Sequence, residues 1–186
     1  GIPINRRRGI VLAMELKERE SLITNRRLTR RHIGYRLSVI VCTTDGGKGS
    51  ETGTDGIITS DNIGEATAIR FAQEGALVVL CGRREAALAV VQEKIFSAGG
   101  QAEIAVADVS DEAAYVGAIE STAQRHGRLD ILVNNAMAFT WGAVDTMSTD
   151  DWHANFRTTV DGTFWGTRTA MRLMKEKGGG SIVNIS

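Results

Sequence analysis

The sequence predicts an α/β protein built on a doubly wound parallel sheet, a three-layer α/β/α arrangement. From residue 63 onward, short apolar runs rich in β-branched residues alternate with longer helical segments. Strands that alternate with helices at this spacing form βαβ units, whose parallel sheet is covered on both faces. Right-handed crossovers then produce the doubly wound order.

The elements follow one another regularly along the chain. Asn62 and Glu65 have the spacing of a capping box, so a helix is expected over residues 63–74, ending at Gly75. The apolar run Ala76–Cys81 predicts a buried strand. The later expected elements are a helix over 84–98, a strand over 102–107, a helix over 111–126, a strand over 129–133, a long helix within 149–177 and a strand over 181–185.

The region before residue 63 is harder to interpret. Leu37–Thr43 is the only good candidate for a first strand. Between this run and the first helix lies a stretch, residues 45–61, that is rich in Gly, Thr, Ser and Asp. We therefore expect a long connection after the first strand.

Composition excludes several classes of protein. The chain has 186 residues, 42% of them apolar and 24% charged, which argues against a disordered or low-complexity protein. No apolar run is long enough to cross a bilayer. Cys42 and Cys81 are far apart and offer neither a disulfide framework nor a metal-ligand spacing, so we expect no metal site and a cytoplasmic, reducing location.

Charge divides the chain into two parts. Residues 1–36 contain ten Lys or Arg and three Glu, a net charge of +7, so the rest of the neutral chain carries −7. We expect residues 1–36 to be a separate basic segment, with disorder as one expectation, and residues 37–186 to be the folded domain. A nucleic-acid or membrane arm, a transit peptide and an artificially joined segment are alternatives for this part, with nucleic acid and membrane disfavoured because three Glu interrupt the arginines. Gly1 is not an initiator residue, which indicates a processed, tagged or partial chain.

The candidate binding residues come directly after the predicted strands. In an open parallel sheet, ligands bind beyond the carboxyl ends of the strands. The residues in that position are Gly82-Arg83-Arg84, Asp108-Val109-Ser110 and Asn134-Asn135-Ala136. A dinucleotide is expected to lie along this edge.

Five stretches of the sequence resemble the short-chain dehydrogenase/reductase family, over roughly residues 57–186. They are IGEATAIRFAQEGALVVLCGRREAAL, ADVSDEAA, GRLDILVNNA, GTFWGTRTAMRLM and GGGSIVNIS, in the family's order and spacing. The resemblance implies a Rossmann-type fold, a nicotinamide dinucleotide and hydride transfer between an alcohol and a carbonyl. It covers the first two-thirds of such a domain, which implies a partial NAD(P)-binding domain that is incomplete at its C-terminal side.

By this resemblance, Ile63 and Gly64 match the end of the family's glycine-rich phosphate turn. A glycine there lets helix and strand approach closely while the helix N-terminus faces the pyrophosphate. The rest of the turn departs from the pattern, and two alignments are open. Either the first strand is Val39–Thr43, followed by an insertion of about eighteen residues, or it falls without a gap on residues 48–56, which are poor strand sequence.

The resemblance also assigns residues after the third and fourth strands. Asp108 and Val109 match the pair that flanks the adenine, while Asn135 and Ala136 match the segment near the cofactor ribose. A helix N-cap at Asp108 or Ser110, and an Asx turn at the asparagine, are the structural alternatives.

Arg83 and Arg84 bear on the choice of cofactor. An acidic residue after the second strand would accept the ribose 2′-hydroxyl of NAD, whereas here Gly82 leaves space and Arg83 offers a forked donor set to a 2′-phosphate. Two arginines at a helix N-terminus oppose the helix dipole, which a purely structural surface would avoid. We therefore expect NADP in preference to NAD, with solvated surface arginines as the alternative.

The catalytic set that the resemblance implies is not present in the 186 residues. Thr159 stands at the family's active-site Asn position, the family Ser would follow Ser186, and neither Tyr35 nor Tyr115 has a Lys four residues on. We expect an NADP(H)-dependent oxidoreductase of small alcohols or carbonyls by family, inactive as the chain stands. A non-catalytic dinucleotide-binding or dimerising remnant is the alternative, and an exposed last strand favours a homo-oligomer in either case.

Overall fold

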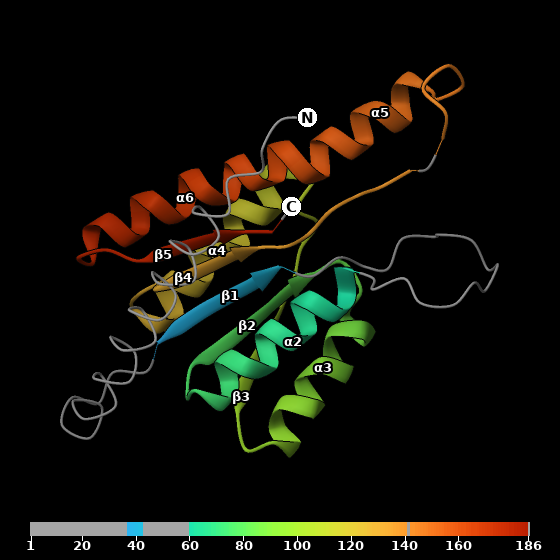
Figure 1. Ribbon diagram of the computed structural model, residues 1–186. Coiled ribbons are helices and arrows are strands. Elements are labelled where there is room, and N and C mark those ends of the chain that lie inside the picture. Colours follow the sequence, from blue (N-terminus) through green and yellow to red (C-terminus); the bar gives the residue numbers. More distant parts are fainter. Residues whose placement is uncertain (1–36, 43–59, 141, 186) are drawn as a thin grey trace, which may run out of the picture. The chain divides into compact units, whose positions relative to one another are not determined.

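The computed structural model describes residues 37–42, 60–140 and 142–185, and Figure 1 shows its ribbon. The side chains of residues 60–62 are not described either. The basic segment 1–36 and the stretch 43–59 thus lie outside the described residues. The division of the chain at residue 36 therefore stays a prediction.

The described strands form one parallel sheet in the order β3-β2-β1-β4-β5. The first strand lies in the centre, and the chain winds outward from it on both sides, so the predicted doubly wound fold is confirmed. The strands are β1 (Ser38–Cys42), β2 (Leu77–Gly82), β3 (Gln101–Val106), β4 (Ile131–Asn134) and β5 (Ser181–Asn184). The helices are α2 (Ser60–Gln73), α3 (Glu85–Ser97), α4 (Glu112–His126), α5 (Thr149–Phe156) and α6 (Gly162–Glu176), with a π-helical segment, η1 (Arg157–Asp161), between the last two.

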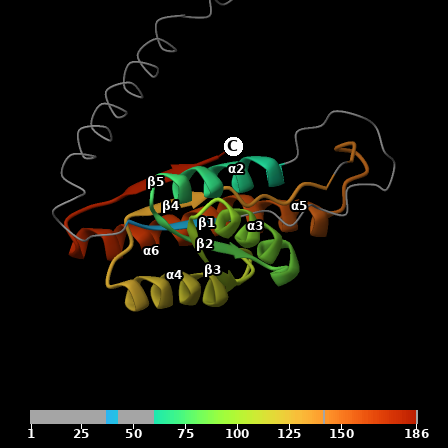
Figure 2. The same ribbon diagram turned by 90° about the horizontal axis from the view of Figure 1, so that it is seen from below.

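Helices cover both faces of the sheet. Helices α2 and α3 lie on one face, and α4 and α6 lie side by side on the other, as Figures 1 and 2 show. Successive side chains of a strand point to opposite faces, so the central strands are buried on both sides. One core contains Val39, Val41, Val78 and Leu80 with residues of α2 and α3; the other contains Ile40, Cys42, Val79 and Cys81 with residues of α4 and α6.

The position of β1 decides between the two alignments of the first strand. Ser38 pairs with Leu77 of β2, and Val39 pairs with Ile131 of β4, so β1 is the central strand. The gapped alignment is confirmed, and the ungapped alignment to residues 48–56 is wrong. The reason is burial, because every residue of β1 is apolar or small enough to lie in the core, whereas residues 48–56 are mostly polar or Gly.

The start of the first helix differs from the prediction. Helix α2 begins at Ser60, so Asn62 lies inside the helix and is not its N-cap, which makes the predicted capping box wrong. Ser60 and Asp61 are residue types that suit a first helical turn, where amides lack partners and the dipole is positive. The helix still ends before Gly75, whose φ of 83° stops it as predicted.

Candidate functional site

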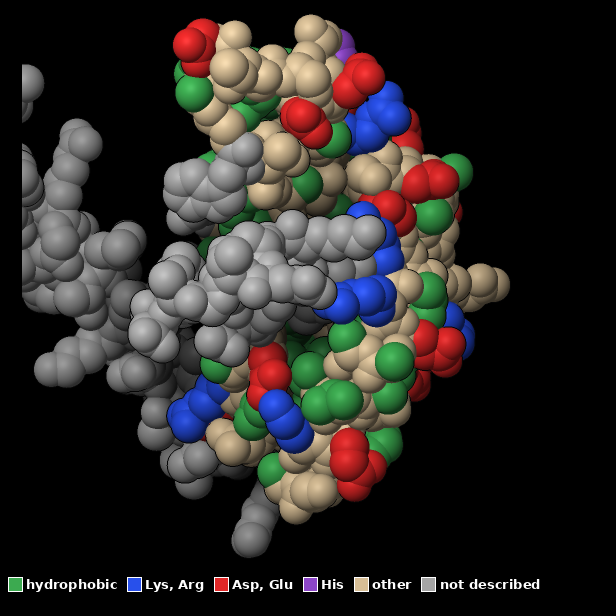
Figure 3. All heavy atoms as spheres, turned by 90° about the vertical axis from the view of Figure 1, so that its right-hand side faces the viewer, with side chains coloured by type: hydrophobic (Ala, Val, Ile, Leu, Met, Phe, Trp, Pro, Cys, Tyr) green, Lys and Arg blue, Asp and Glu red, His purple; other side chains and the backbone are tan. Residues whose placement is uncertain are grey.

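The carboxyl ends of the strands bring the predicted site residues to one edge of the sheet. Because all strand pairs are parallel, the segments after β2, β3 and β4 leave the sheet at the same edge. This edge lies at the strand arrowheads in Figure 1, and Figure 3 looks onto it, with basic and acidic side chains next to each other. The segment after β2 and the segment after β4 lie on opposite sides of β1.

Ile63 and Gly64 lie where the first turn of α2 meets the second, rather than at the first residue of the helix. Gly64 is buried and Ile63 is half exposed, because α2 begins at Ser60. The segment that would complete a phosphate turn before them, residues 43–59, lies outside the described residues.

Arg83 and Asp108 meet across the ends of β2 and β3. Arg83 Nη1 lies 3.9 Å from Asp108 Oδ2, and the Arg83 side chain is 58% exposed. Arg84 precedes α3 at its N-cap position with an extended backbone, and its side chain makes no capping hydrogen bond. Gly82, at the end of β2, is buried and adds no side chain here. An exposed ion pair at this distance contributes little to stability.

Asp108 shapes the loop that follows β3. Its Oδ1 accepts hydrogen bonds from the Ser110 amide at 2.8 Å and from the Ser110 hydroxyl at 2.7 Å, an Asx turn. The N-cap of α4 is instead Asp111, whose Oδ1 accepts from the Ala114 amide at 3.0 Å. The alternative interpretations of Asp108 and Ser110 as helix caps are therefore wrong, because Asp111 occupies the cap position and both residues precede it in the Asx turn.

The residues after β4 lie between this loop and α6. Asn135 is buried, Ala136 is half-buried, and the neighbouring Met137 is 43% exposed. Ala136 and Val109 line one narrow cleft together with Thr158 and Thr163. The cleft has about 160 Å³ of empty space, yet it is too narrow to hold a water molecule.

A polar chain that the sequence did not reveal forms the floor of this cleft. The Tyr115 hydroxyl donates to Asn134 Oδ1 at 2.8 Å and lies 2.9 Å from Cys42 Sγ. Asn134 Nδ2 donates to Asn184 Oδ1 at 2.9 Å and to Thr167 Oγ1 at 3.3 Å. Gly166 of α6 lies on this chain, since a Cβ there would come within 2.7 Å of the Tyr115 hydroxyl. Gly162, Gly166 and Ala170 recur every fourth residue along α6. This row of small residues is the one sequence signal that α6 packs closely against its neighbours.

Burial controls protonation in this region. Burial raises the pKa of the Tyr115 hydroxyl well above its ordinary value, and the nearby Cys42 raises it further. The hydrogen bond with Cys42, followed by burial, raises the pKa of the Cys81 thiol well above its ordinary value. Both groups therefore keep their protons at neutral pH, which makes them hydrogen-bond donors rather than bases or nucleophiles.

A wider, more open cavity lies elsewhere. It occupies about 610 Å³ along the free edge of β3, between α3 and α4, and is open to solvent. Its lining includes Glu103 and Arg125, which form an ion pair at 3.4 Å. We attach the site to the carboxyl edge instead, because the residues of several strands converge there.

Two kinds of site have no counterpart in the part of the chain that the structure describes. No group of three or more His, Cys, Asp or Glu residues there could hold a metal ion. None of the helices described is both long enough and apolar enough to span a membrane.

Comparison with known proteins identifies the family. Residues 57–186 match the family model described as short chain dehydrogenase. The chain belongs to the short-chain dehydrogenase/reductase family. It is 39% identical to (2S)-[(R)-hydroxy(phenyl)methyl]succinyl-CoA dehydrogenase subunit BbsD of Thauera aromatica over 130 residues, 69% of this chain and 52% of that protein. It is 36% identical to the NADP-dependent (R)-specific alcohol dehydrogenase of Lentilactobacillus kefiri, over 67% of this chain and 49% of that enzyme.

The solved structures agree with the fold. A metagenomic short-chain oxidoreductase in complex with NADP superimposes with a TM-score of 0.68 at 29% identity, covering 81% of this chain and 62% of that one. The chain spans about half the length of the curated short-chain dehydrogenases/reductases that it matches. The Rossmann-type parallel sheet that the resemblance implied is thus confirmed.

Thr159, which the resemblance assigned to the family's active-site Asn position, lies in the middle of η1. Its carbonyl oxygen accepts a hydrogen bond from the Thr163 hydroxyl at 2.7 Å. A π-helical turn changes the backbone hydrogen-bonding register, and such turns are frequent at functional sites. This short-chain dehydrogenase/reductase therefore has an irregular helical turn around Thr159.

Proposed function

We propose that this chain binds a nicotinamide dinucleotide along the carboxyl edge of its sheet and prefers NADP(H) to NAD(H). The observation that carries the proposal is the end of β2, where Gly82 has no side chain and the Arg83 guanidinium is exposed beside Asp108. A planar forked cation suits a phosphate, whereas the 2′-hydroxyl of NAD calls for a carboxylate. The NADP dependence of the Lentilactobacillus relative and the NADP complex of the metagenomic one support this preference.

The remaining residues at this edge fit the other parts of the cofactor. The Asp108 turn and Val109 would flank the adenine, and Asn135 with Ala136 would lie against a ribose. Ile63 and Gly64, near the start of α2, would lie at the pyrophosphate, where helix amides and dipole favour an anion. When bound, the nicotinamide gives or takes a hydride; the residues described here bind and orient it.

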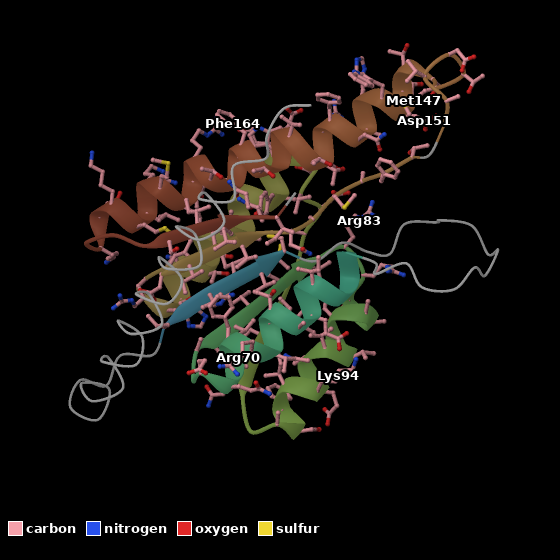
Figure 4. The ribbon with its side chains drawn as sticks, viewed as in Figure 1. Arg70, Arg83, Lys94, Met147, Asp151 and Phe164 are labelled. Atoms are coloured by element: carbon pink, nitrogen blue, oxygen red, sulfur yellow. The ribbon has the colours of Figure 1, made fainter. Side chains whose placement is uncertain are left out.

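A titration of Arg83→Ala tests the cofactor preference. NADP⁺ and NAD⁺ are titrated into the full chain and the variant by calorimetry. Loss of a charged hydrogen bond to the 2′-phosphate, about 1.5–3 kcal/mol, predicts a roughly tenfold to hundredfold loss of NADP⁺ affinity with NAD⁺ affinity nearly unchanged. Arg70→Ala is the control, since Arg70 is exposed, pairs with Glu74 and lies on α2 away from Arg83 in Figure 4. Equal losses for both cofactors would refute the role of Arg83.

The whole protein, on this proposal, is an oxidoreductase that transfers hydride between the cofactor and a small alcohol or carbonyl. The 186 residues alone would bind without turnover. Tyr115 is the one tyrosine in the described ranges, and it is buried with its hydroxyl donated to Asn134, so it does not serve as an acid–base group. NADPH-dependent reduction of any member of a carbonyl panel by the pure chain would contradict this. A non-catalytic binding or dimerising role is the second candidate function. The burial of Tyr115, which excludes it as an acid–base group, favours this candidate as well.

Self-association and location are also proposals. Large apolar side chains stand exposed along α5, η1 and α6, one every four residues: Trp152, Phe156, Val160 and Phe164. The start of this helical stretch is acidic (Asp150, Asp151) and its end, Lys175-Glu176-Lys177, has a net positive charge, so an antiparallel second copy would bring opposite net charges together. From this surface we infer a homo-oligomer.

We also infer a reducing, cytoplasmic environment, because neither Cys42 nor Cys81 is in a disulfide.

A further inference from the structure

A chain of hydrogen bonds crosses the molecule just below the carboxyl edge of the sheet. It joins Cys42 at the end of β1, Tyr115 of α4, Asn134 at the end of β4 and Asn184 at the end of β5. The first three residues are at most 5% exposed. These hydrogen bonds thus connect three strands and one helix, far apart in sequence, at the level where the strands end.

The donors and acceptors fix one direction for this chain. Asn134 uses its amide nitrogen to donate to Asn184 and Thr167, so its oxygen must accept from Tyr115. The Tyr115 oxygen then has only lone pairs left, so the Cys42 thiol donates to it. Burial keeps the Tyr115 proton in place by raising its pKa. Each side chain consequently has one orientation.

The surroundings leave no substitute for the Tyr115 hydroxyl. Gly166 is packed against the bond, since a Cβ at this position would lie 2.7 Å from the Tyr115 hydroxyl and 2.8 Å from Asn134 Oδ1. The neighbouring cleft does not admit water. Without the hydroxyl, Asn134 Oδ1 would be buried with no donor, and the amide would have to turn.

This chain reaches the ligand edge through the residue that follows it. Asn134 and Asn135 are consecutive residues joined by a peptide bond. The cleft above Tyr115 and Asn134 is lined in part by Val109 and Ala136. Arg83, by contrast, leaves the sheet on the other side of β1. The two halves of a dinucleotide would therefore lie on different sides of β1, one at Arg83 and one at Asn135.

We propose that Tyr115 is a positioning residue, whose hydroxyl holds Asn135 and Ala136, through Asn134, in place for the nicotinamide-side ribose. This inference rests on the proposed dinucleotide function. It assigns to Tyr115 a role in one half of the ligand only. The adenosine half, at Arg83 and Asp108, does not depend on it.

Tyr115→Phe in the full chain tests this with two ligands. NADP⁺ affinity is expected to fall roughly tenfold, the effect of one buried acceptor left without its donor. The affinity for adenosine 2′,5′-bisphosphate, which carries only the adenosine half with its phosphate, is expected to stay within about twofold. Equal weakening of both ligands, or of neither, would overturn the proposal.

Amide hydrogen exchange of the ligand-free chain gives a second readout. Tyr115→Phe is expected to speed exchange of the Asn135 and Ala136 amides several-fold and to leave Gly82 and Arg83 unchanged. Gly166→Ala, which displaces the same bond, is expected to act in the same direction. Thr122→Val is the control, because it removes a buried hydroxyl of α4 that bonds only within its own helix region, to the Ala118 carbonyl and Arg125.

The two readouts separate the two claims. If the unaltered chain binds no NADP⁺, the proposed function fails, while the exchange rates still decide the role of Tyr115. If the chain binds NADP⁺ but Tyr115→Phe exchanges at Asn135 and Ala136 like Thr122→Val, the positioning role is refuted and the dinucleotide site stands.

Discussion

At the scale of single residues, the site depends on glycines that allow α6 to approach the ligand edge. A Cβ at Gly162 would lie 2.8 Å from the Val109 carbonyl oxygen, a backbone atom that cannot rotate away. At Gly117, in the middle of α4, the same atom would meet nothing within 4 Å. The same substitution, Gly to Ala, is thus expected to change the free energy of unfolding in opposite directions at these two helix positions.

Gly162→Ala is expected to lower the free energy of unfolding by about 1–3 kcal/mol, the usual cost of overpacking. Gly117→Ala is expected to raise it by about 0.5–1 kcal/mol, because alanine loses less backbone entropy in a helix. Urea denaturation followed by circular dichroism measures both. No destabilisation by Gly162→Ala would mean that α6 does not touch the loop after β3 as described. Destabilisation by Gly117→Ala would mean that a side chain at Gly117 does not point into open space.

Protonation of buried groups predicts a dependence of stability on pH. Cys81 and Tyr115 have pKa values raised in the folded chain, so above their ordinary values the unfolded chain releases protons that the folded chain keeps. The contribution of these groups to the free energy of unfolding is therefore fully present below the ordinary cysteine pKa of about 8.5. Above that pH the free energy of unfolding falls, by up to about 1.4 kcal/mol per pH unit for each group.

Urea midpoints at pH 7.5 and 9.5 check this pH dependence. The midpoint is expected to fall between these values, and Cys81→Ala is expected to show a smaller fall than the unaltered chain. An equal fall in the variant would exclude Cys81 as the source.

Residue-level predictability from the sequence was uneven. Gly82 and the two arginines could be found because they directly follow a recognisable strand. Tyr115 could not, since its partners Asn134 and Cys42 are 19 and 73 residues away and nothing near it in α4 signals a buried hydroxyl. Long-range hydrogen bonds leave no local pattern in a sequence.

At the scale of elements, the helical stretch from α5 to α6 carries the exposed apolar side chains. Phe164 is 57% exposed and points away from the sheet in Figure 4. Val90, on α3 and therefore on the other side of the sheet, is equally exposed. This pair offers a matched test of the self-association surface.

Phe164→Glu is expected to shift the chain from oligomer to monomer in sedimentation velocity at tens of micromolar, because burying a charged carboxylate at an apolar contact carries a desolvation cost. Val90→Glu is expected to leave the oligomer intact. A monomer in the unaltered chain, or dissociation by Val90→Glu, would contradict the assignment of this surface.

Most elements could be predicted because their signals are local. Most strands are short apolar runs and every helix described except α5 ends near a glycine, so the predicted bounds differ from the observed ones by at most three residues. The π-helical turn at Thr159 could not be predicted from residue types, since it depends on how the backbone hydrogen bonds shift register between α5 and α6. The start of α2 was misjudged because Asn is also tolerated inside a first turn.

At the scale of the whole molecule, the sheet order explains why the sequence alone predicts the edge at which the site lies. Parallel strands wound outward from β1 must place their carboxyl ends together, so residues after β2, β3 and β4 share one edge. The rest of the pyrophosphate turn could not be judged, since its residues depart from the family pattern and lie outside those described.

The central claim is that this edge binds the dinucleotide. The most direct measurement is residue-resolved hydrogen exchange of the full chain with and without saturating NADP⁺. Protection is expected at residues 82–84, 108–110 and 134–136, and not along the open cavity beside β3. No protection, or protection confined to Glu103–Val106 and Arg125 around that cavity, would contradict the account.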